Sequence, residues 1–336
     1  MGFGESVIVN PDEDGMRLLR LFERRYPSLP IGLVYKLCRT GQVRLDGKRT
    51  DPSVRVSSSQ VIRIPPSVTM KSSSITCGEG AASGGDCSLH SRTDTRSDAE
   101  FLRSITLYED DTVLVLNKPE GLAVQGGPGI TKSIDSMLAS LTCRRGHVPR
   151  LVHRLDRDTA GCLVVAKRRS IAAELTGLFR SRSVRKIYWA LVMGVPSVEQ
   201  GKISIFVSSR RVAELVRVVG HGDAGALHAV SYYSVLDKAG SKFSWLTLQP
   251  VTGRTHQLRV QCAHIGHSIV GDSKYTCDMH VDLPKRGSFS KLHLLARRVV
   301  LSIPSTGQRL DVSASLAPHM QSSWDLLGFD ANRFSL

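Results

Sequence analysis

The stretch HRLDRDTAG, residues 153–161, places Asp156 among basic side chains and leads directly into the apolar run CLVVA. Thr159, Ala160 and Gly161 are typical of a tight turn, and the run that follows is typical of a buried strand. We therefore expect Asp156 on a loop at the mouth of a strand, where catalytic groups are often displayed. Its basic neighbours would keep the carboxylate ionised, as a nucleophile or a base requires. A structural aspartate that caps the turn fits the same pattern.

The region around this stretch, residues 101–330, is predicted to be an α+β domain with flanking helices. Its strand-like runs outnumber its helices and show no regular βαβ alternation, which favours a mixed, mostly antiparallel sheet. The expected strands cover residues 112–117, 162–166, 187–192 and 243–248. Between the second and third strands, helical spacing groups Ile171, Leu175, Leu178 and Phe179 on one side. After Gly253, a further helix is expected to turn inward Leu258, Cys262 and Ile265.

The N-terminal region, residues 11–66, is predicted to be a small helix-helix-hairpin unit with a basic face. In MRLLRLFERRYP, helical spacing groups Leu19, Phe22 and Tyr26. A second helix is expected over about residues 32–39, and Asp46-Gly47 predicts the turn of a hairpin. The candidate contacts for a polyanion are Arg17, Arg20, Arg24, Lys36, Arg39, Arg44 and Lys48. The alternative is an ordinary solvated face, because charged residues commonly lie opposite the apolar stripe of a helix.

Residues 67–100 are predicted to be a flexible linker between these two regions. From residue 71 to residue 100, fourteen of thirty positions are Ser, Gly or Thr, and Ile75 and Leu89 are the only large aliphatic side chains. Such a segment buries too little apolar area to offset the entropy that is lost on ordering it.

The net charge of the 336-residue chain is +15, which favours a polyanionic partner. Nucleic acid is the first expectation, and an anionic membrane surface or simply a basic enzyme are the alternatives. We expect no membrane span, because the chain has no apolar run of about 18 residues and no secretory signal. The seven cysteines are scattered without a Cys-x-x-Cys pair, which is typical of free thiols in a reducing cytoplasm. We therefore expect a cytoplasmic location.

Other kinds of active site are disfavoured by the same sequence. A metal ion bound by His153 and Asp156 would be repelled by the arginines beside them, and His264-x-x-His267 lacks a plausible second pair of ligands. The chain has no Walker loop, no strand-linked GxGxxG and no GxSxG elbow. These absences disfavour an NTPase, a dinucleotide enzyme and a serine hydrolase. We expect neither a metal nor a cofactor.

HRLDRDTAG resembles the sequence HRLDxxTSG that marks the RluA family of RNA pseudouridine synthases. Further stretches resemble motifs of this family in the family's order: NKPEGLAVQGG (117–127), RKIYWALV (185–192) and GRTHQLRVQCAHIGHSIVGDSKY (253–275). The N-terminal unit resembles an S4 RNA-binding domain, as in the members that act on large-subunit ribosomal RNA. Together these likenesses cover most of the chain outside the linker. Two departures are Ala160, where the family usually has Ser, and the long insertion between the domains.

The resemblance implies isomerisation of uridine to pseudouridine in RNA, with 23S ribosomal RNA as the implied substrate. The N1–C1′ bond breaks and C5 bonds to C1′, so nothing is added or lost and no cofactor is required. A base within a helix is unreachable, so the uridine must be flipped out. In this family the aspartate at the position of Asp156 acts on the sugar, as nucleophile or as base, and the sequence does not choose between these roles. Asp158 is expected to be a loop or capping residue.

The resemblance also assigns roles to residues outside the first motif. Tyr188 is the implied tyrosine against the flipped uracil, and Arg254 is the implied partner of the catalytic aspartate. Arg154 would occupy the gap that the flipped base leaves in the RNA stack. Lys118 and Tyr275 would support the pocket. By position alone, Tyr188 equally fits a core residue and Arg254 a surface residue.

We expect a monomer that binds RNA, without membrane contact and without an obligate protein partner. The main alternative is a noncatalytic RNA-binding or ribosome-assembly protein on the same fold. A scaffold has no need for Asp156, Tyr188 and Arg254 together. A weaker alternative is another RNA enzyme such as a methyltransferase, which would need a cofactor loop.

Overall fold

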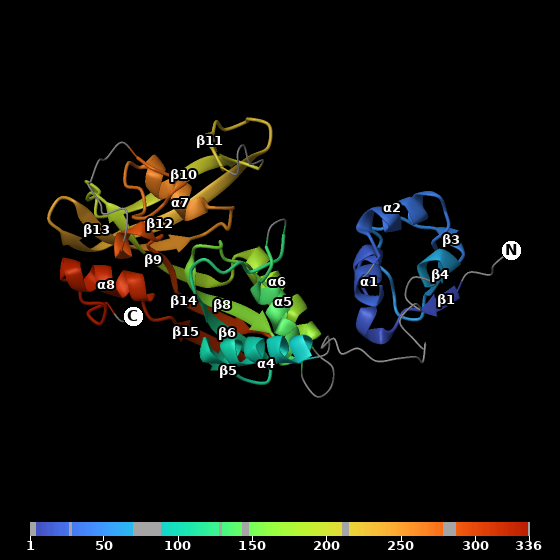
Figure 1. The fold of residues 1–336 in the computed structure, drawn as a ribbon. Helices are drawn as coiled ribbons and strands as arrows, with labels where there is room; N and C mark the ends of the chain where they lie inside the picture. The colour runs from blue at the N-terminus through green and yellow to red at the C-terminus, as the bar shows by residue number, and fades with distance from the viewer. Residues whose placement is uncertain are drawn as a thin grey trace. The chain divides into compact units, whose positions relative to one another are not determined.

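The computed structural model describes residues 5–26, 29–69, 89–127, 130–142, 148–209, 215–277 and 287–334 (Figure 1). The chain divides into two compact units, one up to residue 85 and the other from residue 86 onward. Each unit has a hydrophobic core of its own. In the described residues, none of the helices combines the length and the apolar character that crossing a bilayer would require.

The N-terminal unit packs two helices against a four-stranded antiparallel sheet. The helices are α1 (Leu18–Arg25) and α2 (Ile31–Arg39), close to the predicted ranges. The strands are β1 (Glu5–Ile8), β2 (Arg44–Leu45), β3 (Lys48–Arg49) and β4 (Val61–Ile64). They lie in the order β1-β4-β2-β3. The short helices of this unit are η1 (Pro11–Glu13) and α3 (Pro66–Thr69).

Two details of this unit differ from the expectation. Strand β1 pairs with β4, so the unit begins before the expected boundary at residue 11. A four-residue strand carries too little periodicity to be recognised in the sequence. The buried side of α1 consists of Leu18, Leu21 and Phe22, whereas Leu19 is only partly buried.

The predicted hairpin turns at Asp46 and Gly47, whose φ angles are 49° and 76°. A two-residue type I′ turn requires positive φ at both positions, and an Asp-Gly pair accepts this at low steric cost. All seven candidate cations of the unit are exposed: Arg17, Arg20, Arg24, Lys36, Arg39, Arg44 and Lys48.

Part of the predicted linker forms a helix. Residues 70–88 lie outside the described residues, but α4 (Leu89–Ser104) begins well before the expected boundary at residue 100. The helix is anchored by Leu102, which is fully buried in a cluster with Met137. The composition of residues 71–100 taken together did not indicate this helix. All glycines of the segment lie before residue 89, so the part that forms the helix contains none.

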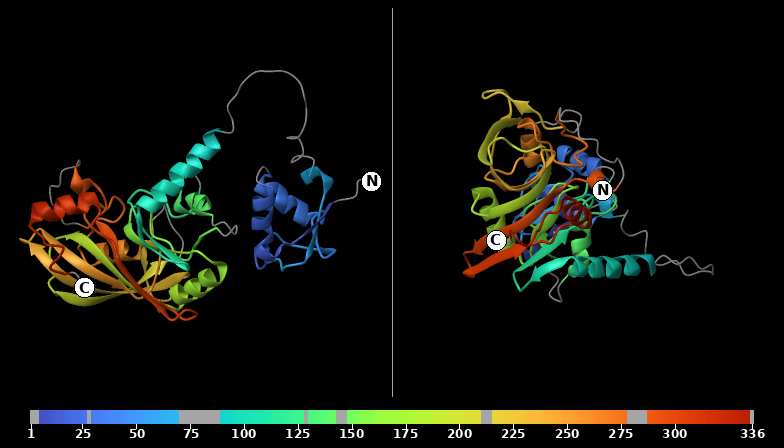
Figure 2. Two further views of the ribbon diagram at one scale, coloured as in Figure 1. Left: turned by 90° about the horizontal axis from the view of Figure 1, so that it is seen from below. Right: turned by 90° about the vertical axis from the view of Figure 1, so that its left-hand side faces the viewer.

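The second unit is built on a mixed, mostly antiparallel sheet of eleven strands, as predicted. The strands are β5 (Thr106–Glu109), β6 (Val113–Lys118), β7 (Arg150–Leu151), β8 (Ala160–Ala166), β9 (Arg185–Met193), β10 (Gln200–Ser208), β11 (Val218–Val219), β12 (Ala226–Ala239), β13 (Phe243–Pro250), β14 (Leu294–Ile303) and β15 (Gln308–Ser313). Nine follow the order β11-β10-β12-β13-β9-β14-β8-β6-β5, while β15 pairs with β14 and β7 with β8. Among the described strands, only β14 and β8 form a parallel ladder. Figure 2 shows how the strand direction changes along the sheet.

Helices cover both faces of this sheet. Besides α4 they are α5 (Ile134–Met137), η2 (Leu138–Leu141), α6 (Arg169–Ser181), α7 (Gln257–His264), η3 (Ser288–Ser290) and α8 (Pro318–Leu327). Side chains on one face of the central strands form a core with α6 and α8. The opposite face carries one cluster with α4 and α5 and another with α7.

The predicted helix sides agree largely with these cores. The predicted residues that are buried are Ile171, Leu175, Leu258 and Cys262. The predicted residues that are only partly buried are Leu178, Phe179 and Ile265. The helical period therefore identified the inner face of α6 and α7, but not how far it extends toward the C-terminal end of each helix.

All three tryptophans of the chain lie in the core with α6 and α8, and all are fully buried. The rings of Trp189 and Trp324 contact that of Trp245 edge-on, with centroids 4.7 and 5.3 Å from it. The Arg297 guanidinium lies over Trp189 at 4.3 Å. Because aromatic side chains bury large apolar areas, this cluster contributes to the stability of the second unit.

Candidate active site

The loop that carries Asp156 is fixed at its start by His153. The imidazole stacks on Phe179 of α6 with ring centroids 4.2 Å apart, and its Nε2 accepts a hydrogen bond from the Val164 amide at 2.8 Å. Burial, and then the positive charge of Lys186, lower the pKa of His153 to about 3. The ring is therefore neutral near physiological pH and available as an acceptor.

At the other end of the loop, Gly161 lets β8 approach β14 closely. Its φ angle is 106°, in the left-handed region that favours glycine, and a Cβ there would lie 2.3 Å from the Ala296 carbonyl oxygen. The neighbouring Ala160, which stands where the family usually has Ser, is buried in the core with α6 and α8. A serine hydroxyl at this position would need a hydrogen-bond partner inside an apolar core.

Asp156 lines a cavity of about 390 Å³. The other lining residues fall within 153–159, 179–188 and 250–259, apart from Leu294. Four predicted functional residues come together here: Arg154, Asp156, Tyr188 and Arg254. Asp156 is the only carboxylate among the lining residues, whereas the lining cations are Arg154, Arg180, Arg182, Lys186, Arg254 and Arg259. The volume lies in the range of about 300–1,000 Å³ that is typical of ligand sites.

The carboxylate of Asp156 is half-buried, and within the described residues it accepts no hydrogen bond and forms no ion pair. The expected pair with Arg254 is not formed, because the Arg254 Nε donates to the backbone carbonyl of His228 at 3.2 Å. Asp156 instead interacts at longer range with two buried cations, Lys118 and Arg259. Its oxygens are therefore free to contact a substrate.

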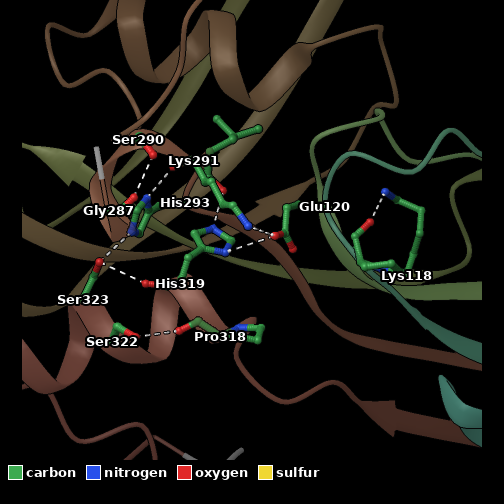
Figure 3. Close-up of polar contacts among 12 residues, drawn as sticks. Lys118, Glu120, Gly287, Ser290, Lys291, His293, Pro318, His319, Ser322 and Ser323 are labelled. Carbon is green, nitrogen blue, oxygen red and sulfur yellow. Dashed lines mark hydrogen bonds and ion pairs between the residues drawn. The ribbon is translucent and has the colours of Figure 1, made fainter. Parts of the chain in front are cut away.

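Lys118, the last residue of β6, joins two loops of the site. Its side chain is fully buried and donates to the carbonyls of Pro119, Leu122 and Arg157 at 2.7, 2.9 and 2.8 Å, the first of which is drawn in Figure 3. Burial lowers the pKa of Lys118 to about 8, although nearby carboxylates, Asp158 foremost, oppose this shift. Lys118 does not line the cavity; it holds the backbone of the loop that carries Asp156.

The loop after Lys118 is also tied to the C-terminal part of the unit (Figure 3). The Lys291 Nζ lies 2.6 Å from the Glu120 Oε1, and the His319 Nδ1 lies 3.8 Å from the same oxygen. His293 donates from its Nδ1 to the Lys291 carbonyl at 2.8 Å, and its Nε2 lies 2.9 Å from the Ser323 hydroxyl oxygen. The chain from β14 to α8 therefore helps to position the segment that follows β6.

Tyr188 is one of the residues that line the cavity. It is in β9, paired with Leu248 of β13 and Ala296 of β14, and its side chain packs against both the α4–α5 cluster and the α7 cluster. Burial, and then the negative charge of Asp156, raise the pKa of Tyr188 well above its ordinary value. Its hydroxyl is therefore a protonated phenol over the physiological pH range, with no hydrogen-bond partner among the described residues.

A buried ion pair joins Arg259, which lines the cavity from α7, to Asp272. The Arg259 Nε and Nη2 bond to the Asp272 Oδ2 and Oδ1 at 2.7 and 2.6 Å. Burial disfavours the charge on Arg259, but its hydrogen bonds to Asp272 outweigh this effect and raise its pKa. The guanidinium lies 5.3 Å from the ring centroid of Tyr275. The Tyr275 hydroxyl accepts from the Val216 amide at 2.9 Å and contacts the His256 Nδ1 at 2.8 Å.

Gln257, the first residue of α7, orders the loop before it. Its Oε1 accepts from the Thr252 hydroxyl at 2.7 Å and from the Arg254 amide at 3.0 Å. Its Nε2 donates to the Val230 carbonyl at 3.0 Å and to the Ser231 hydroxyl at 2.9 Å. Because the Gln257 side chain is buried and satisfied by all four bonds, it strongly restricts where Arg254 can lie.

Several residues of the site were missed by sequence reasoning. Asp272 could have been suspected, because it lies in the GDSKY end of the third motif, but Lys291 and His319 lie in no motif. Asp158 was expected to cap a turn, yet its side chain makes no hydrogen bond to the described residues. Nowhere in the described ranges do three His, Cys, Asp or Glu side chains come close enough to hold a metal ion.

Comparison with known proteins agrees with this geometry. Residues 112–264 match the family model described as RNA pseudouridylate synthase. The protein named RNA pseudouridine synthase 4, mitochondrial, from Arabidopsis thaliana is 35% identical over 82% of this chain, which spans 64% of that relative's length. Ribosomal large subunit pseudouridine synthase C from Vibrio cholerae is 31% identical over 94% of this chain and 95% of its own length.

A solved structure shows a similar fold. The structure titled Human RNA Pseudouridylate Synthase Domain Containing 4 superposes with a TM-score of 0.60 at 27% identity, covering 71% of this chain and 98% of that one. The region that matches the family model includes the loop of Asp156, the strand of Tyr188 and all of α7. On sequence, fold and the grouping of these residues, this chain belongs to the RNA pseudouridine synthase family.

Proposed function

We propose that this protein isomerises uridine to pseudouridine within RNA, with Asp156 acting on the ribose. The observation that carries the proposal is the composition of the cavity, where one unpartnered carboxylate and one protonated phenol lie among six cations. A cavity of this charge suits a segment of a polyanion. The reaction breaks the N1–C1′ bond and forms the C5–C1′ bond, so its atoms balance without a further reactant.

A single carboxylate suffices for this chemistry. Hydrolysis of ordinary O-glycosides uses two carboxylates, one of which protonates the leaving group. A uracil anion delocalises its own charge, so the leaving base needs no acid of that kind. Asp156 would act at C1′ as a nucleophile, or remove a proton from the sugar as a base; both roles need the free carboxylate oxygens.

The remaining predicted residues have roles around this step. Tyr188 would pack against the flipped uracil. Because its phenol is protonated, it would move the C5 proton as a relay, giving its own proton to N1 while it takes the one from C5. Arg154 is exposed beside the cavity, where its guanidinium could stack in the gap left by the flipped base. Arg254 would exchange its bond to the His228 carbonyl for Asp156 or for RNA when substrate binds. Lys118 and Tyr275 support the surrounding loops.

The substrate that we propose is large-subunit ribosomal RNA, of the 23S type. Support comes from the Vibrio relatives, whose names specify the ribosomal large subunit and whose length this chain nearly spans. In this proposal the N-terminal unit, on which the seven candidate cations are exposed, is an S4-like module that contributes affinity for folded RNA. We further propose that the protein acts as a monomer, without an obligate protein partner or membrane contact.

We also propose a cytoplasmic location. Its support is the state of the cysteines, because Cys38, Cys162, Cys262 and Cys277 are free thiols in the described part of the chain. The name of the Arabidopsis relative places that protein in mitochondria. Cell fractionation with an antibody against the native chain would decide between the two compartments.

The function is tested by mapping pseudouridines in large-subunit ribosomal RNA after incubation with the native protein and with Asp156→Asn. The native protein should create specific pseudouridines, and Asp156→Asn should create none while its affinity for RNA stays within a few-fold. RNA binding by the native protein without any isomerisation would favour a noncatalytic assembly protein. Activity that survives in Asp156→Asn would refute the role of this residue.

A further inference from the structure

Three cations that line the cavity have no role in the steps above. Arg180 belongs to the last turn of α6, Arg182 follows that helix directly, and Lys186 is in β9. Arg180 and Arg182 are exposed, whereas Lys186 is half-buried. They come from one continuous stretch of chain that reaches the cavity beside the His153–Phe179 stack.

These cations have no counter-charge of their own. Among the described residues, the side chains of Arg180, Arg182 and Lys186 form no ion pair and donate no hydrogen bond. Burial, and then repulsion by Arg182, lower the pKa of Lys186. Like charges held this close repel one another, and a bound anion would remove the repulsion. Some other basic residues of this unit are paired, such as Arg298 with Asp311 and Lys167 with Glu109.

The position of Lys186 relates this cluster to the reacting base. Side chains two apart on a strand point to the same face, at a spacing of about 7 Å. Lys186 and Tyr188 share the face of β9 that borders the cavity, while Ile187 between them is buried on the other side. An anion bound at Lys186 would therefore lie next to a base that packs on Tyr188, at roughly the separation of neighbouring groups along an RNA strand.

The backbone at Arg182 favours the same interpretation. Its φ angle is 64°, and its amide bonds to the Leu178 carbonyl to end α6. This left-handed position at a helix end is most often glycine, because a side chain there is strained. An arginine here adds a long cationic side chain to the cavity, although glycine would end the helix with less strain.

We propose that Arg180, Arg182 and Lys186 form a subsite for the phosphodiester of a nucleotide adjacent to the target uridine. The inference rests on the proposed function, because it uses Tyr188 as the contact for the target base. The cluster would hold the strand on one side of the flipped nucleotide, so that removal of the base from the stack does not let the backbone slide. The competing interpretation is three solvated cations that touch no phosphate.

The test compares the full-length native chain with Arg182→Gln/Lys186→Gln and with the matched control Arg168→Gln/Arg169→Gln, which neutralises two cations at the other end of α6. Binding to a twelve-nucleotide oligouridylate is measured by fluorescence anisotropy over a series of KCl concentrations. Because the probe is single-stranded, the slope of log Kd against log[KCl] should fall by about 0.7 for each phosphate that the subsite variant no longer binds. The control should keep the native slope.

A second measurement localises the phosphate. In RNA that contains a uridine modified by the native protein, each phosphodiester linkage around that uridine is replaced in turn by a neutral methylphosphonate. At one linkage next to the uridine, the methylphosphonate should weaken binding to the native protein several-fold and raise its KM. At the same linkage it should not weaken binding to the subsite variant any further. Lys186→Arg, which keeps the charge, should respond as the native chain does, and thermal melting would confirm that each variant is folded.

The outcomes separate this inference from the proposed function. If the native protein modifies RNA but the subsite variant and the control have equal salt slopes, the subsite is wrong and the function stands. If no uridine is modified, the function fails, while the oligouridylate slopes still decide whether these cations contact phosphate. The inference would also be overturned if a methylphosphonate at that linkage weakened RNA binding by the native chain and by the subsite variant alike.

Discussion

Single side chains of this site differ in how much of their bonding capacity is already used. Within the described residues, neither the Asp156 carboxylate nor the Tyr188 hydroxyl has a hydrogen-bond partner, whereas Lys118 uses all three of its N–H groups. The first two are therefore available to a substrate, and Lys118 holds structure. The motifs predicted that Asp156 and Tyr188 share a site, but spacing along the chain does not reveal that Arg254 bonds to a carbonyl instead of to Asp156.

Replacing the Tyr188 hydroxyl should affect chemistry and leave folding intact. In Tyr188→Phe, the rate of pseudouridine formation under single-turnover conditions should fall by about 10²-fold or more, in the range typical of removing a proton-transfer group. The melting temperature should change little, because the ring and its packing remain. Tyr232→Phe makes the same chemical change on an exposed ring in β12 and should keep the native rate. Nearly full activity in Tyr188→Phe would exclude a role for the phenol.

Lys118 should make the stability of the protein depend on pH. Its pKa is lowered from 10.5 to about 8 in the folded state, so the unfolded chain binds one more proton between these values. Relative to Lys118→Met, the free energy of unfolding of the native chain should rise with pH from about 8 to 10.5, by at most ~1.4 kcal/mol per pH unit. Urea unfolding at several pH values measures this difference. A difference that is flat over this window would show that Lys118 keeps its ordinary pKa.

The helices and strands that could be predicted from the sequence are those with a long apolar run or a clear helical repeat. The four predicted strands were recognisable as largely apolar runs of five or six residues, and the helix α6 by its helical repeat. The two-residue strands β7 and β11 carry no such signal. The strand order, and with it the parallel contact of β14 with β8, depends on residues more than 130 positions apart, which a local pattern does not encode.

The close contact between β8 and β14 can be tested with alanine. Gly161→Ala places a Cβ against the Ala296 carbonyl and should lower the free energy of unfolding by about 3 kcal/mol or more. Gly121 also has positive φ, 78°, but a Cβ there would meet nothing within 4 Å. Gly121→Ala should therefore cost only about 1–2 kcal/mol. Urea unfolding measures both free energies. Equal losses of unfolding free energy in the two variants would show that the close approach of β8 to β14 does not require glycine at position 161.

The molecule as a whole consists of two compact units. The basic N-terminal unit and the second unit have separate cores, and the cavity lies entirely in the second. Composition predicted this division, because a Ser- and Gly-rich segment interrupts the apolar patterns on either side. It did not predict the helix α4, because most of the residues of α4 are polar and resemble in composition the segment before it.

Neutralising cations of the N-terminal unit should weaken RNA binding without slowing the chemical step. The variant Arg20→Gln/Arg39→Gln/Lys48→Gln tests this. Its slope of log Kd against log[KCl] for ribosomal RNA should fall by up to about one for each phosphate contact that is lost. Its single-turnover rate at saturating protein concentration should equal that of the native protein. Three exposed cations of the second unit serve as the control: Arg103, Arg168 and Arg309. If both triple variants change the salt dependence equally, the N-terminal unit has no special part in RNA affinity.

The clustering of all three indole side chains in one core has a practical consequence. Intrinsic fluorescence excited near the red edge of indole absorption would report only on the second unit, since the N-terminal unit contains no such chromophore. Circular dichroism, in contrast, would register the backbone of both. Denaturation profiles recorded with the two optical signals on one sample should diverge wherever the units melt independently, and would coincide only if they unfold as one cooperative body.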